Sequence, residues 1–385
     1  MKKILFVLQS ARSGGSTTSL LNLIQLLDKK KLDISVFFME NEGTFINKFQ
    51  ESVQVVPEEK IISSITCSAA EIKKRGVLAF LIRVSFVILH HIFGKERTEN
   101  WFYRLSARRF NSQFDTVVAF QESKVTEYVR FIKAAQKIAW VHCDYDRFAI
   151  GKSIEMETML YNEYSKIVCV SNYARDSIIR NLKINKNKVK TIYNTVPINQ
   201  IRQLSQSADV IQLCSKYVFI SVGRFVPVKG FDKVVYIAKR MKDKNLDFKW
   251  ILVGDGPEFN KIDNMIKKEN LEDYVMMVGN QENPYKYMKL ADYYICTSIC
   301  ETHPMVVLEA LSLGKPVLST EYPSVHEVLE DGKNGIVFPN SAEGLWEGIE
   351  SVLENDAIAA TISNGAKRFI YDNDLIIKQV YDILD

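Results

Sequence analysis

The chain has 385 residues, enough for two domains, and its 47% hydrophobic and 25% charged residues are typical of a globular protein. The net charge of +4 is unevenly distributed: residues 1–190 carry 30 Lys and Arg against 19 Asp and Glu, and the remainder carries 20 against 27. The basic first half indicates an anionic partner, and without an aromatic-interleaved basic patch a membrane surface or a diphosphate-linked molecule is favoured over nucleic acid.

Cysteine usage and the N-terminus both indicate a cytoplasmic protein. The six cysteines are scattered and form no C-x-x-C pair, which predicts reduced thiols rather than a zinc site or disulfides. The apolar run Ile4–Leu8 is too short for the core of a secretory signal, and it predicts a buried first strand instead.

The first residues follow the pattern of a doubly wound nucleotide-binding unit. Lys2–Leu8 predicts a strand, a loop contains Gly14 and Gly15, and Thr17–Leu27 predicts a helix because its apolar residues recur at helical spacing. The full G-x-G-x-x-G is missing, so a dinucleotide-dependent oxidoreductase is not favoured. The glycines serve either the approach of a ligand or only the geometry of a tight turn. Two further strands are expected: Ile34–Met39 and Val53–Val56.

Residues 71–110 contain the most apolar stretch of the chain, Val77–Phe93, with Lys and Arg residues on both sides. A membrane-spanning helix needs about 20 apolar residues without a central charge, and Arg83 argues against one. Two interpretations stay open: an amphipathic helix lying on a membrane surface, and an ordinary core helix of the first domain. The first would give a peripheral contact through 71–110 with the inner face of the plasma membrane.

A histidine follows one of the later strands of the first half. The strands are expected at Phe114–Phe120, Lys137–Val141 and Ser165–Val170. His142 comes directly after the second of them, at the edge where doubly wound sheets bind ligands, and the alternative is a structural histidine that caps the next loop. Asp144 and Asp146 form a D-x-D triplet, but this triplet is short and common, and a metal site is not predicted from it.

The second half opens with a strand that is followed by two cations. Tyr217–Gly223 predicts the strand, and Asp232–Met241 predicts the helix that comes next. Between them lie Arg224, whose guanidinium presents a planar fork of donors to phosphate, and Lys229, which adds a movable charge. The alternative is two solvated surface cations.

The stretch Thr297–Thr320 predicts a loop, a helix, a turn and a strand. Pro304 fits the first helical position and Gly314 the end of the helix. Glu301 lies before the helix and Glu309 within it, and the N–H groups at the helix start suit a phosphate. Two carboxylates beside a phosphate site suit a nucleotide sugar, which has phosphates at its middle and hydroxyls at both ends. An amphipathic helix with two incidental glutamates is the alternative.

The spacing of Glu301 and Glu309 resembles the E-x7-E signature of the retaining glycosyltransferases of family 4, the group 1 glycosyltransferases, which have the GT-B fold. Further matches occur in the family's order: the Gly14-Gly15 loop, His142, and Arg224 with Lys229 in a G-R-x4-K-G loop. The usual Glu-Gly-Phe start of the signature reads Glu-Thr-His here, so the backbone must approach the phosphates past a threonine side chain.

The resemblance implies an α/β protein of GT-B fold, with two Rossmann-like, doubly wound parallel-sheet domains that face a central cleft. The expected domains are an acceptor-binding domain over 1–205 and a nucleotide-sugar donor domain over 206–370, and the polar residues around 200–209 predict a hinge. Residues 371–385 are expected to form a helix that returns to the first domain.

The resemblance also implies the roles of the site residues. Arg224 and Lys229 would stabilise the leaving diphosphate, Glu301 would orient the donor sugar, and His142 is the fourth catalytic residue. Glu309 would accept hydrogen bonds from the ribose. The donor-binding residues are Gly14, Gly15, Arg224, Lys229, Asn280, Glu301, Thr302, His303, Pro304, Met305, Val306, Val307 and Glu309. No metal and no cofactor other than the nucleotide sugar is expected.

The resemblance thus implies a metal-independent, retaining hexosyltransferase-type glycosyltransferase. It would move a sugar from a nucleotide sugar, a UDP-sugar being favoured over a GDP-sugar, to a glycan or lipid-diphosphate-linked acceptor in the synthesis of bacterial capsule or cell-wall polysaccharide. A UDP-sugar 2-epimerase shares the fold, and a catalytically silent sugar-nucleotide-binding subunit is a second alternative. The presence of both glutamates together with Arg224 and Lys229 argues against the silent subunit.

Overall fold

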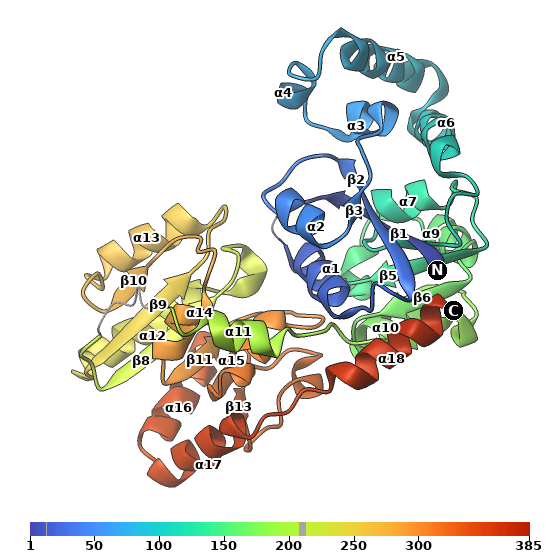
Figure 1. Ribbon diagram of the computed structural model, residues 1–385. Helices are drawn as coiled ribbons and strands as arrows, with labels where there is room; N and C mark the ends of the chain where they lie inside the picture. The colour runs from blue at the N-terminus through green and yellow to red at the C-terminus, as the bar shows by residue number, and fades with distance from the viewer. Residues whose placement is uncertain (13, 208–212) are drawn as a thin grey trace. The chain divides into compact units, whose positions relative to one another are not determined.

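The computed structural model describes residues 1–12, 14–207 and 213–385, which form two compact α/β units (Figure 1). Unit 1 consists of Met1–Thr195 together with Asn373–Asp385, and unit 2 consists of Val196–Asp372. Each unit has its own parallel sheet and its own hydrophobic core. The two parallel-sheet units confirm the predicted architecture.

Unit 1 is built on a seven-stranded sheet with the order β3-β2-β1-β4-β5-β6-β7, in which every neighbouring pair is parallel. The strands are β1 (Lys2–Ser10), β2 (Leu32–Glu40), β3 (Gln54–Val55), β4 (Thr116–Ala119), β5 (Gln136–Val141), β6 (Lys166–Cys169) and β7 (Val189–Thr191). The strand order reverses between β1 and β4, and ligands of doubly wound sheets bind beyond the carboxyl ends of the strands at such a switch point.

The helices of unit 1 cover the two faces of this sheet, except for the segment α3–α6, which extends from one end of the unit (Figure 1). They are α1 (Gly15–Leu26), α2 (Ile46–Ser52), α3 (Lys60–Thr66), α4 (Ala69–Ile72), α5 (Val77–Phe93), α6 (Lys95–Ala107), α7 (Lys124–Val129), α8 (Tyr145–Phe148), α9 (Ile154–Asn162), α10 (Asn172–Asn181) and α18 (Asn373–Leu384). Short 3₁₀ turns lie at Arg108–Phe110 (η1) and Lys186–Lys188 (η2).

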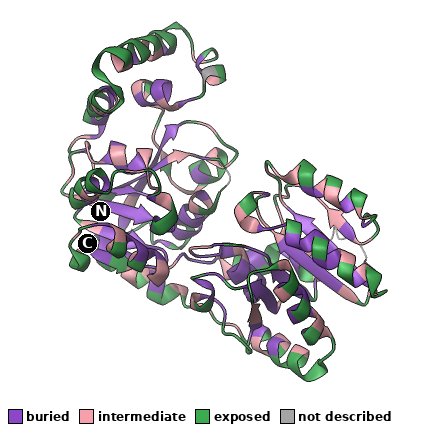
Figure 2. Cartoon of the chain, turned by 180° about the vertical axis from the view of Figure 1, so that it is seen from behind, coloured by how far each residue is buried: buried purple, intermediate pink, exposed green. Residues whose placement is uncertain are grey.

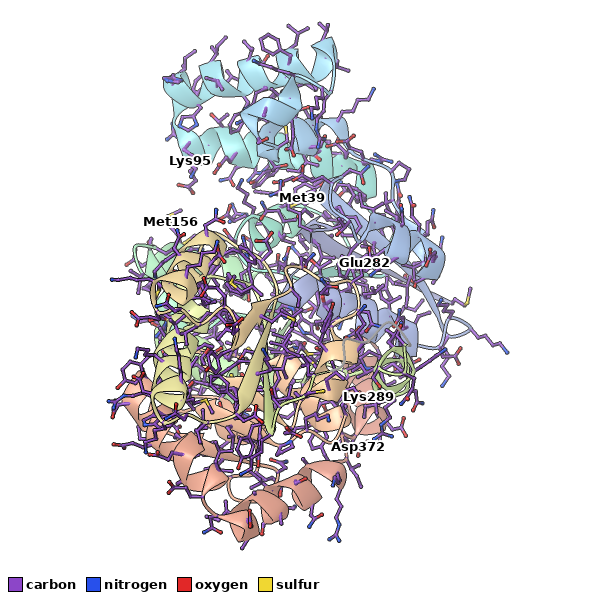
Figure 3. The ribbon with its side chains drawn as sticks, turned by 90° about the vertical axis from the view of Figure 1, so that its left-hand side faces the viewer. Met39, Lys95, Met156, Glu282, Lys289 and Asp372 are labelled. Atoms are coloured by element: carbon purple, nitrogen blue, oxygen red, sulfur yellow. The ribbon has the colours of Figure 1, made fainter. Side chains whose placement is uncertain are left out.

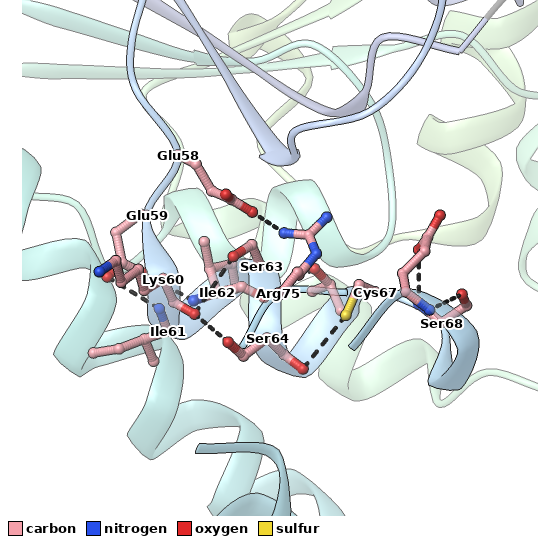
Figure 4. Close-up of polar contacts among 12 residues, drawn as sticks. Glu58, Glu59, Lys60, Ile61, Ile62, Ser63, Ser64, Cys67, Ser68 and Arg75 are labelled. Atoms are coloured by element: carbon pink, nitrogen blue, oxygen red, sulfur yellow. Dashed lines mark hydrogen bonds and ion pairs between the residues drawn. The ribbon is translucent and has the colours of Figure 1, made fainter. Parts of the chain in front are cut away.

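The base of the α3–α6 segment is held by polar contacts (Figure 4). Glu59 caps α3 by accepting hydrogen bonds from the N–H groups of its first turn, and Glu58 forms an ion pair with Arg75. Ser68 and Glu71 form a reciprocal capping box on α4. The caps made by Glu59 and Ser68 satisfy donors that a helix start leaves without intrahelical partners, so they fix where α3 and α4 begin.

Unit 2 is built on a six-stranded parallel sheet with the order β10-β9-β8-β11-β12-β13. Its strands are β8 (Tyr217–Val222), β9 (Phe248–Val253), β10 (Val275–Met277), β11 (Tyr293–Cys296), β12 (Val317–Thr320) and β13 (Gly335–Phe338). Its helices are α11 (Ile198–Leu204), α12 (Asp232–Asp243), α13 (Phe259–Lys268), α14 (Tyr285–Leu290), α15 (Met305–Ser312), α16 (Ala342–Leu353) and α17 (Asp356–Lys367), with 3₁₀ turns η3 (Pro227–Lys229) and η4 (Val325–Glu327). The switch point lies between β8 and β11.

The C-terminal helix α18 packs on unit 1, although it follows unit 2 in the sequence. Val380 is fully buried, and Tyr381 accepts a 2.7 Å hydrogen bond from the N–H of Asp28. The last carbonyl groups of the helix accept hydrogen bonds from Lys2 and Lys166. Cations at a helix C-terminus are stabilised by the helix dipole, so these lysines hold the end of α18.

The division between the units differs from the predicted boundary at 205/206. Helix α11 lies in unit 2, because Ile201 is fully buried in the core of that unit. The chain therefore leaves unit 1 at Thr195, and the expected hinge at 200–209 is helical up to Leu204. Its last two residues, 208 and 209, lie outside the described residues.

The predicted helix Val77–Phe93 is present as α5, but it is not an ordinary core helix. Only Ala79 and Phe86 are buried among its 17 residues, and most of its surface is exposed (Figure 2). The core-helix interpretation is therefore wrong. The sequence shows an apolar run, but it does not show whether other elements cover both of its faces.

Candidate functional site

The loops that leave β8 and β11 are joined at the switch point of unit 2. The Thr297 hydroxyl donates a 2.6 Å hydrogen bond to the Lys229 carbonyl, and the Ile299 N–H donates a 2.7 Å bond to Val228. Gly230 has a φ of +61°, and a Cβ there would lie 2.4 Å from the Thr297 carbonyl oxygen. The glycine of the K-G motif is thus required both by its left-handed conformation and by this close approach.

Two of the predicted catalytic residues contact each other directly across these loops. The Lys229 Nζ lies 2.5 Å from the Glu301 Oε1, which also accepts a 2.7 Å hydrogen bond from the Ser298 hydroxyl. Both side chains are largely buried, with 22% and 14% of their surface exposed. Burial alone would lower the pKa of Lys229, but the Glu301 carboxylate outweighs it and raises that pKa. The lysine is therefore held as a cation beside its carboxylate.

Arg224, the other predicted cation, lies two residues after the end of β8 and is exposed. Its guanidinium makes no hydrogen bond or ion pair with any residue that the structure describes. Its backbone is fixed nonetheless, since the Arg224 carbonyl accepts a 2.8 Å bond from Val226 and the next residue, Phe225, stacks on Phe231 at 4.2 Å between ring centroids. Five donors are thus available to an anion at this point of the loop.

Helix α15 starts at Met305, with Pro304 as its cap, one position later than the sequence predicts. His303, Pro304, Met305 and Val307 are buried, whereas Thr302 and Val306 are partly exposed. Burial lowers the pKa of His303 to about 3, so its imidazole is neutral at physiological pH. The first N–H groups of an α-helix have no intrahelical partners, so the main attraction for an anion at this helix start comes from the backbone.

The second glutamate of the motif, Glu309, lies on the buried face of α15 with 5% of its surface exposed. Burial raises its pKa to about 7, although a hydrogen bond from the Tyr285 hydroxyl opposes this rise. Tyr285 is the first residue of α14. Asn280 lies on the loop before α14 and is exposed, and no hydrogen bond joins it to Glu309 or Tyr285.

At the carboxyl edge of unit 1, the two predicted glycines lie where β1 leads into α1. Gly14 is the cap of α1, with a φ of 178° that any residue adopts, and Gly15 is its first residue. A Cβ at either position would meet no atom within 4 Å. The tight-turn interpretation of these glycines is therefore not required by the backbone, and the space in front of them is open.

His142 follows β5, as predicted, and its ring centroid lies 4.8 Å from that of Phe120. The backbone N–H groups of His142 and Cys143 both donate to one carboxylate oxygen of Glu122, which follows the neighbouring strand β4. Burial raises the pKa of Glu122, and these backbone hydrogen bonds oppose the rise. The carboxyl group therefore fixes the start of the loop that carries His142.

Three residues of these edges were not identified from the sequence. Glu122 holds the His142 loop, Tyr285 bonds to Glu309, and Lys233 donates a 2.9 Å hydrogen bond to the Thr297 carbonyl. A signal was available for Glu122, because it follows a strand next to the switch point. Tyr285 and Lys233 lie at the starts of helices, and their partners are far away in the sequence.

The D-x-D residues have structural roles. Asp146 forms a 2.6 Å ion pair with Arg180, and Asp144 caps helix α8. Among the residues that the structure describes, no group of three or more His, Cys, Asp or Glu side chains is placed to hold a metal ion. Metal independence stays a prediction.

Comparisons with known proteins cover both halves of the chain. Residues 207–369 match the family described as "Glycosyl transferases group 1", and residues 13–200 match "Glycosyltransferase Family 4". The chain therefore belongs to the group 1 glycosyltransferases of family 4. The predicted family is confirmed.

Similar proteins are found in bacteria and archaea. An uncharacterized glycosyltransferase of Methanocaldococcus jannaschii is 29% identical over 283 residues, which are 63% of this chain and 70% of the relative. The N-acetylgalactosamine-N,N'-diacetylbacillosaminyl-diphospho-undecaprenol 4-alpha-N-acetylgalactosaminyltransferase of Campylobacter jejuni is 26% identical over 54% of this chain, and the match spans only 56% of its own length. Matches of this kind locate shared domains but not a shared substrate.

A solved structure supports the fold. The crystal structure of Anabaena HepE in complex with UDP and glucose is similar with a TM-score of 0.74, covering 100% of this chain and 99% of that protein at 19% identity. At this identity the likeness shows the fold alone, and the fold is GT-B, as predicted.

Proposed function

We propose that the protein is a retaining hexosyltransferase that transfers a sugar from a UDP-sugar to a glycan or lipid-diphosphate-linked glycan. The observation that carries this proposal is the Lys229–Glu301 pair, held between the two loops of the unit 2 switch point and followed by the start of α15. HepE of Anabaena, which shares the fold, was crystallised with UDP and with UDP-glucose, which favours UDP as the nucleotide here.

The charge distribution of unit 2 matches the charge that develops when a nucleotide sugar is cleaved. Breaking the bond between sugar and diphosphate leaves negative charge on the phosphates, and the exposed Arg224 guanidinium, Lys229 and the N–H groups at the start of α15 would stabilise it. Since no protein-bound metal ion is needed for this, we propose a metal-independent reaction. The acceptor hydroxyl would attack the donor sugar from the side on which the nucleoside diphosphate leaves. The departing phosphate would accept the proton of that hydroxyl.

Donor binding would exchange the contacts of the ion pair. In the free protein the Lys229 ammonium and the Glu301 carboxylate satisfy each other. The donor diphosphate would bind Lys229, and a hydroxyl of the donor sugar would donate to Glu301, which keeps its bond from Ser298. Glu309 would accept from the ribose hydroxyls. The pair thus keeps two buried charges compensated until the donor supplies a phosphate for Lys229 and a hydroxyl donor for Glu301.

To unit 1 we assign the acceptor. We also propose His142, at its carboxyl edge, as a catalytic residue, and Gly14 and Gly15 of the neighbouring loop as donor-binding residues. The relative from Campylobacter jejuni is named for an acceptor linked to undecaprenol through a diphosphate, and the basic first half of this chain suits such an anionic, lipid-linked molecule. We therefore place the reaction in bacterial cell-surface polysaccharide synthesis, at the inner face of the plasma membrane.

The proposal is tested by measuring nucleoside diphosphate release from a panel of UDP- and GDP-sugars. Wild type should release UDP slowly from one donor, and Lys229→Ala and Glu301→Ala should each lower this rate at least ~100-fold, because each removes a charge aimed at the donor. Lys239→Ala on α12 removes a lysine whose ion pair is with Asp243 and not with a site residue, and it should match wild type.

Other outcomes separate the alternatives. A silent sugar-nucleotide-binding subunit would bind UDP and release none from any donor, with or without acceptor. A 2-epimerase would change the configuration at C2 of the sugar instead of transferring it. Equal release by wild type and both site variants would refute the assigned site.

A further inference from the structure

Helix α5 exposes an unusual amount of apolar surface for a helix outside a core. Nine of its large apolar side chains are at least a third exposed: Val77, Leu78, Phe80, Leu81, Val84, Val87, Ile88, Ile92 and Phe93. Figure 3 shows side chains of this segment projecting outward, with Lys95 labelled where α6 begins. Large contiguous apolar patches on a protein surface mark interaction sites.

The inner face of α5 is already used within unit 1. Phe86 is buried against Phe102 of α6, with 5.3 Å between ring centroids, and α5 also packs on α3. Arg83, the only charged residue of the helix, points inward and donates to the carbonyl of Ile65 near the end of α3. The charge that argued against a membrane-spanning helix is therefore absent from the outer face.

Two polar side chains of the outer face, Ser85 and His91, find partners within the helix. The Ser85 hydroxyl donates a 2.9 Å hydrogen bond to the Leu81 carbonyl, and the His91 ring contacts the Val87 carbonyl at 2.7 Å. An apolar environment would thus cover this face without leaving the Ser85 hydroxyl donor unpaired.

The surroundings of the apolar face are strongly basic. Residues 73–109 contain nine Lys and Arg and only two acidic residues, Glu96 and Glu99. Lys73, Lys74, Lys95 and Arg97 are exposed at the two ends of α5. On α6, Arg97, Trp101 and Arg104 recur every three or four residues and are all exposed, so they lie on one face of that helix, and Arg108, also exposed, follows its end.

We infer that α5 and the exposed face of α6 dock unit 1 onto a membrane surface that contains anionic lipid. The apolar side chains of α5 enter the boundary between headgroups and acyl chains, the basic residues bind the anionic headgroups, and Trp101 lies at the interface. No helix among the described residues is long and apolar enough to cross a membrane, and α5 has only 17 residues. The contact is therefore made along the surface.

The charge around α5 also decides against a second copy of this chain as the occupant. A symmetric dimer through this face would bring the basic flanks of both copies together, with only two acidic residues on each to compensate them. Anionic lipid attracts the same flanks. This inference rests on the proposed lipid-linked acceptor. Docking of α5 and α6 on the membrane would bring such an acceptor next to unit 1.

Flotation of the full chain with lipid vesicles tests the inference, without donor or acceptor. Wild type should bind vesicles of phosphatidylcholine mixed with phosphatidylglycerol, bind phosphatidylcholine alone more weakly, and lose binding to the mixture as salt rises. Leu81→Glu combined with Ile88→Glu should lower binding roughly 100-fold, because two apolar contacts are lost. Lys73→Glu combined with Lys74→Glu should remove most of the salt-sensitive part.

The matched control is Ile358→Glu combined with Ile370→Glu, which adds the same charge at two exposed isoleucines of unit 2 and should bind like wild type. All of these positions are exposed, and unchanged circular dichroism of each variant verifies that it folds. Wild type that binds neither vesicle overturns the inference. A second result would also overturn it. If wild type sediments as a dimer without lipid and the Leu81→Glu, Ile88→Glu variant sediments as a monomer, the apolar face of α5 binds a second copy of the chain instead of a membrane. UDP release by the same variants tests the transferase separately.

Discussion

Lys229 and Glu301 illustrate what sequence reasoning reaches at single residues. Both were assigned to the donor from their positions in family motifs, but their direct contact was not foreseen, since 72 residues separate them. The contact depends on Gly230 and Thr297, which bring the two loops together. Residue types and their spacing within one loop can be predicted from the sequence. Contacts between side chains of different loops depend on which strands are neighbours in the sheet, so they require the structure.

Glu309 gives a prediction about pH. Burial raises its pKa to about 7, so the free folded protein retains a proton that the unfolded chain releases above about pH 4.5. Folding stability should therefore fall as the pH rises from about 5 to 8, by roughly 3 kcal/mol from this group. Glu309→Gln does not titrate, and its unfolding free energy, measured by denaturant titration, should depend less on pH.

Donor binding should show the opposite trend, because the ribose hydroxyls donate to the ionised carboxylate. The affinity for UDP should increase as the pH rises through about 7, and this increase should be smaller in Glu309→Gln, where only the terminal phosphate of UDP still titrates. A wild-type affinity that is independent of pH over this range would contradict the role given to Glu309.

At the start of α1, replacing a glycine by alanine should affect folding stability and enzymatic activity differently. Gly15→Ala adds a methyl group in open space at a helical position, so it should leave the melting temperature unchanged or raise the free energy of unfolding by up to about 1 kcal/mol. If a ligand approaches the backbone here, the same change should lower kcat/KM at least ~10-fold. Gly14→Ala changes the cap of α1, so it should lower the free energy of unfolding by up to about 1 kcal/mol, with the same loss of kcat/KM. Full activity in both variants would leave these glycines without a role in binding.

Elements were predictable from sequence where they are long and periodic. Val77–Phe93 is a helix with the predicted bounds, and Thr17–Leu27 and Lys2–Leu8 differ from α1 and β1 by two residues at most. The exposure of α5 was not predictable, because an apolar run has the same sequence whether a protein core or another surface covers it. Several short helices, such as α7 and α14, were missed because they have few turns over which a period can show.

For the whole molecule, the fold was predicted correctly as two doubly wound parallel-sheet units. The position of the division was less accurate: α11 was expected in the first domain, but Ile201 packs in unit 2. Polar residues indicated a linker there, and tertiary packing of one apolar residue decided otherwise. The return of the C-terminal segment to unit 1 followed from the family resemblance and not from local sequence.

Calorimetric titration of the protein with UDP is the most direct test that unit 2 is a nucleotide-sugar site. Wild type should bind UDP, Arg224→Ala should bind at least ~10-fold more weakly because a charged donor to phosphate is lost, and Lys239→Ala should bind like wild type. If wild type does not bind UDP, or if Arg224→Ala binds it equally well, the switch point of unit 2 is not the donor site.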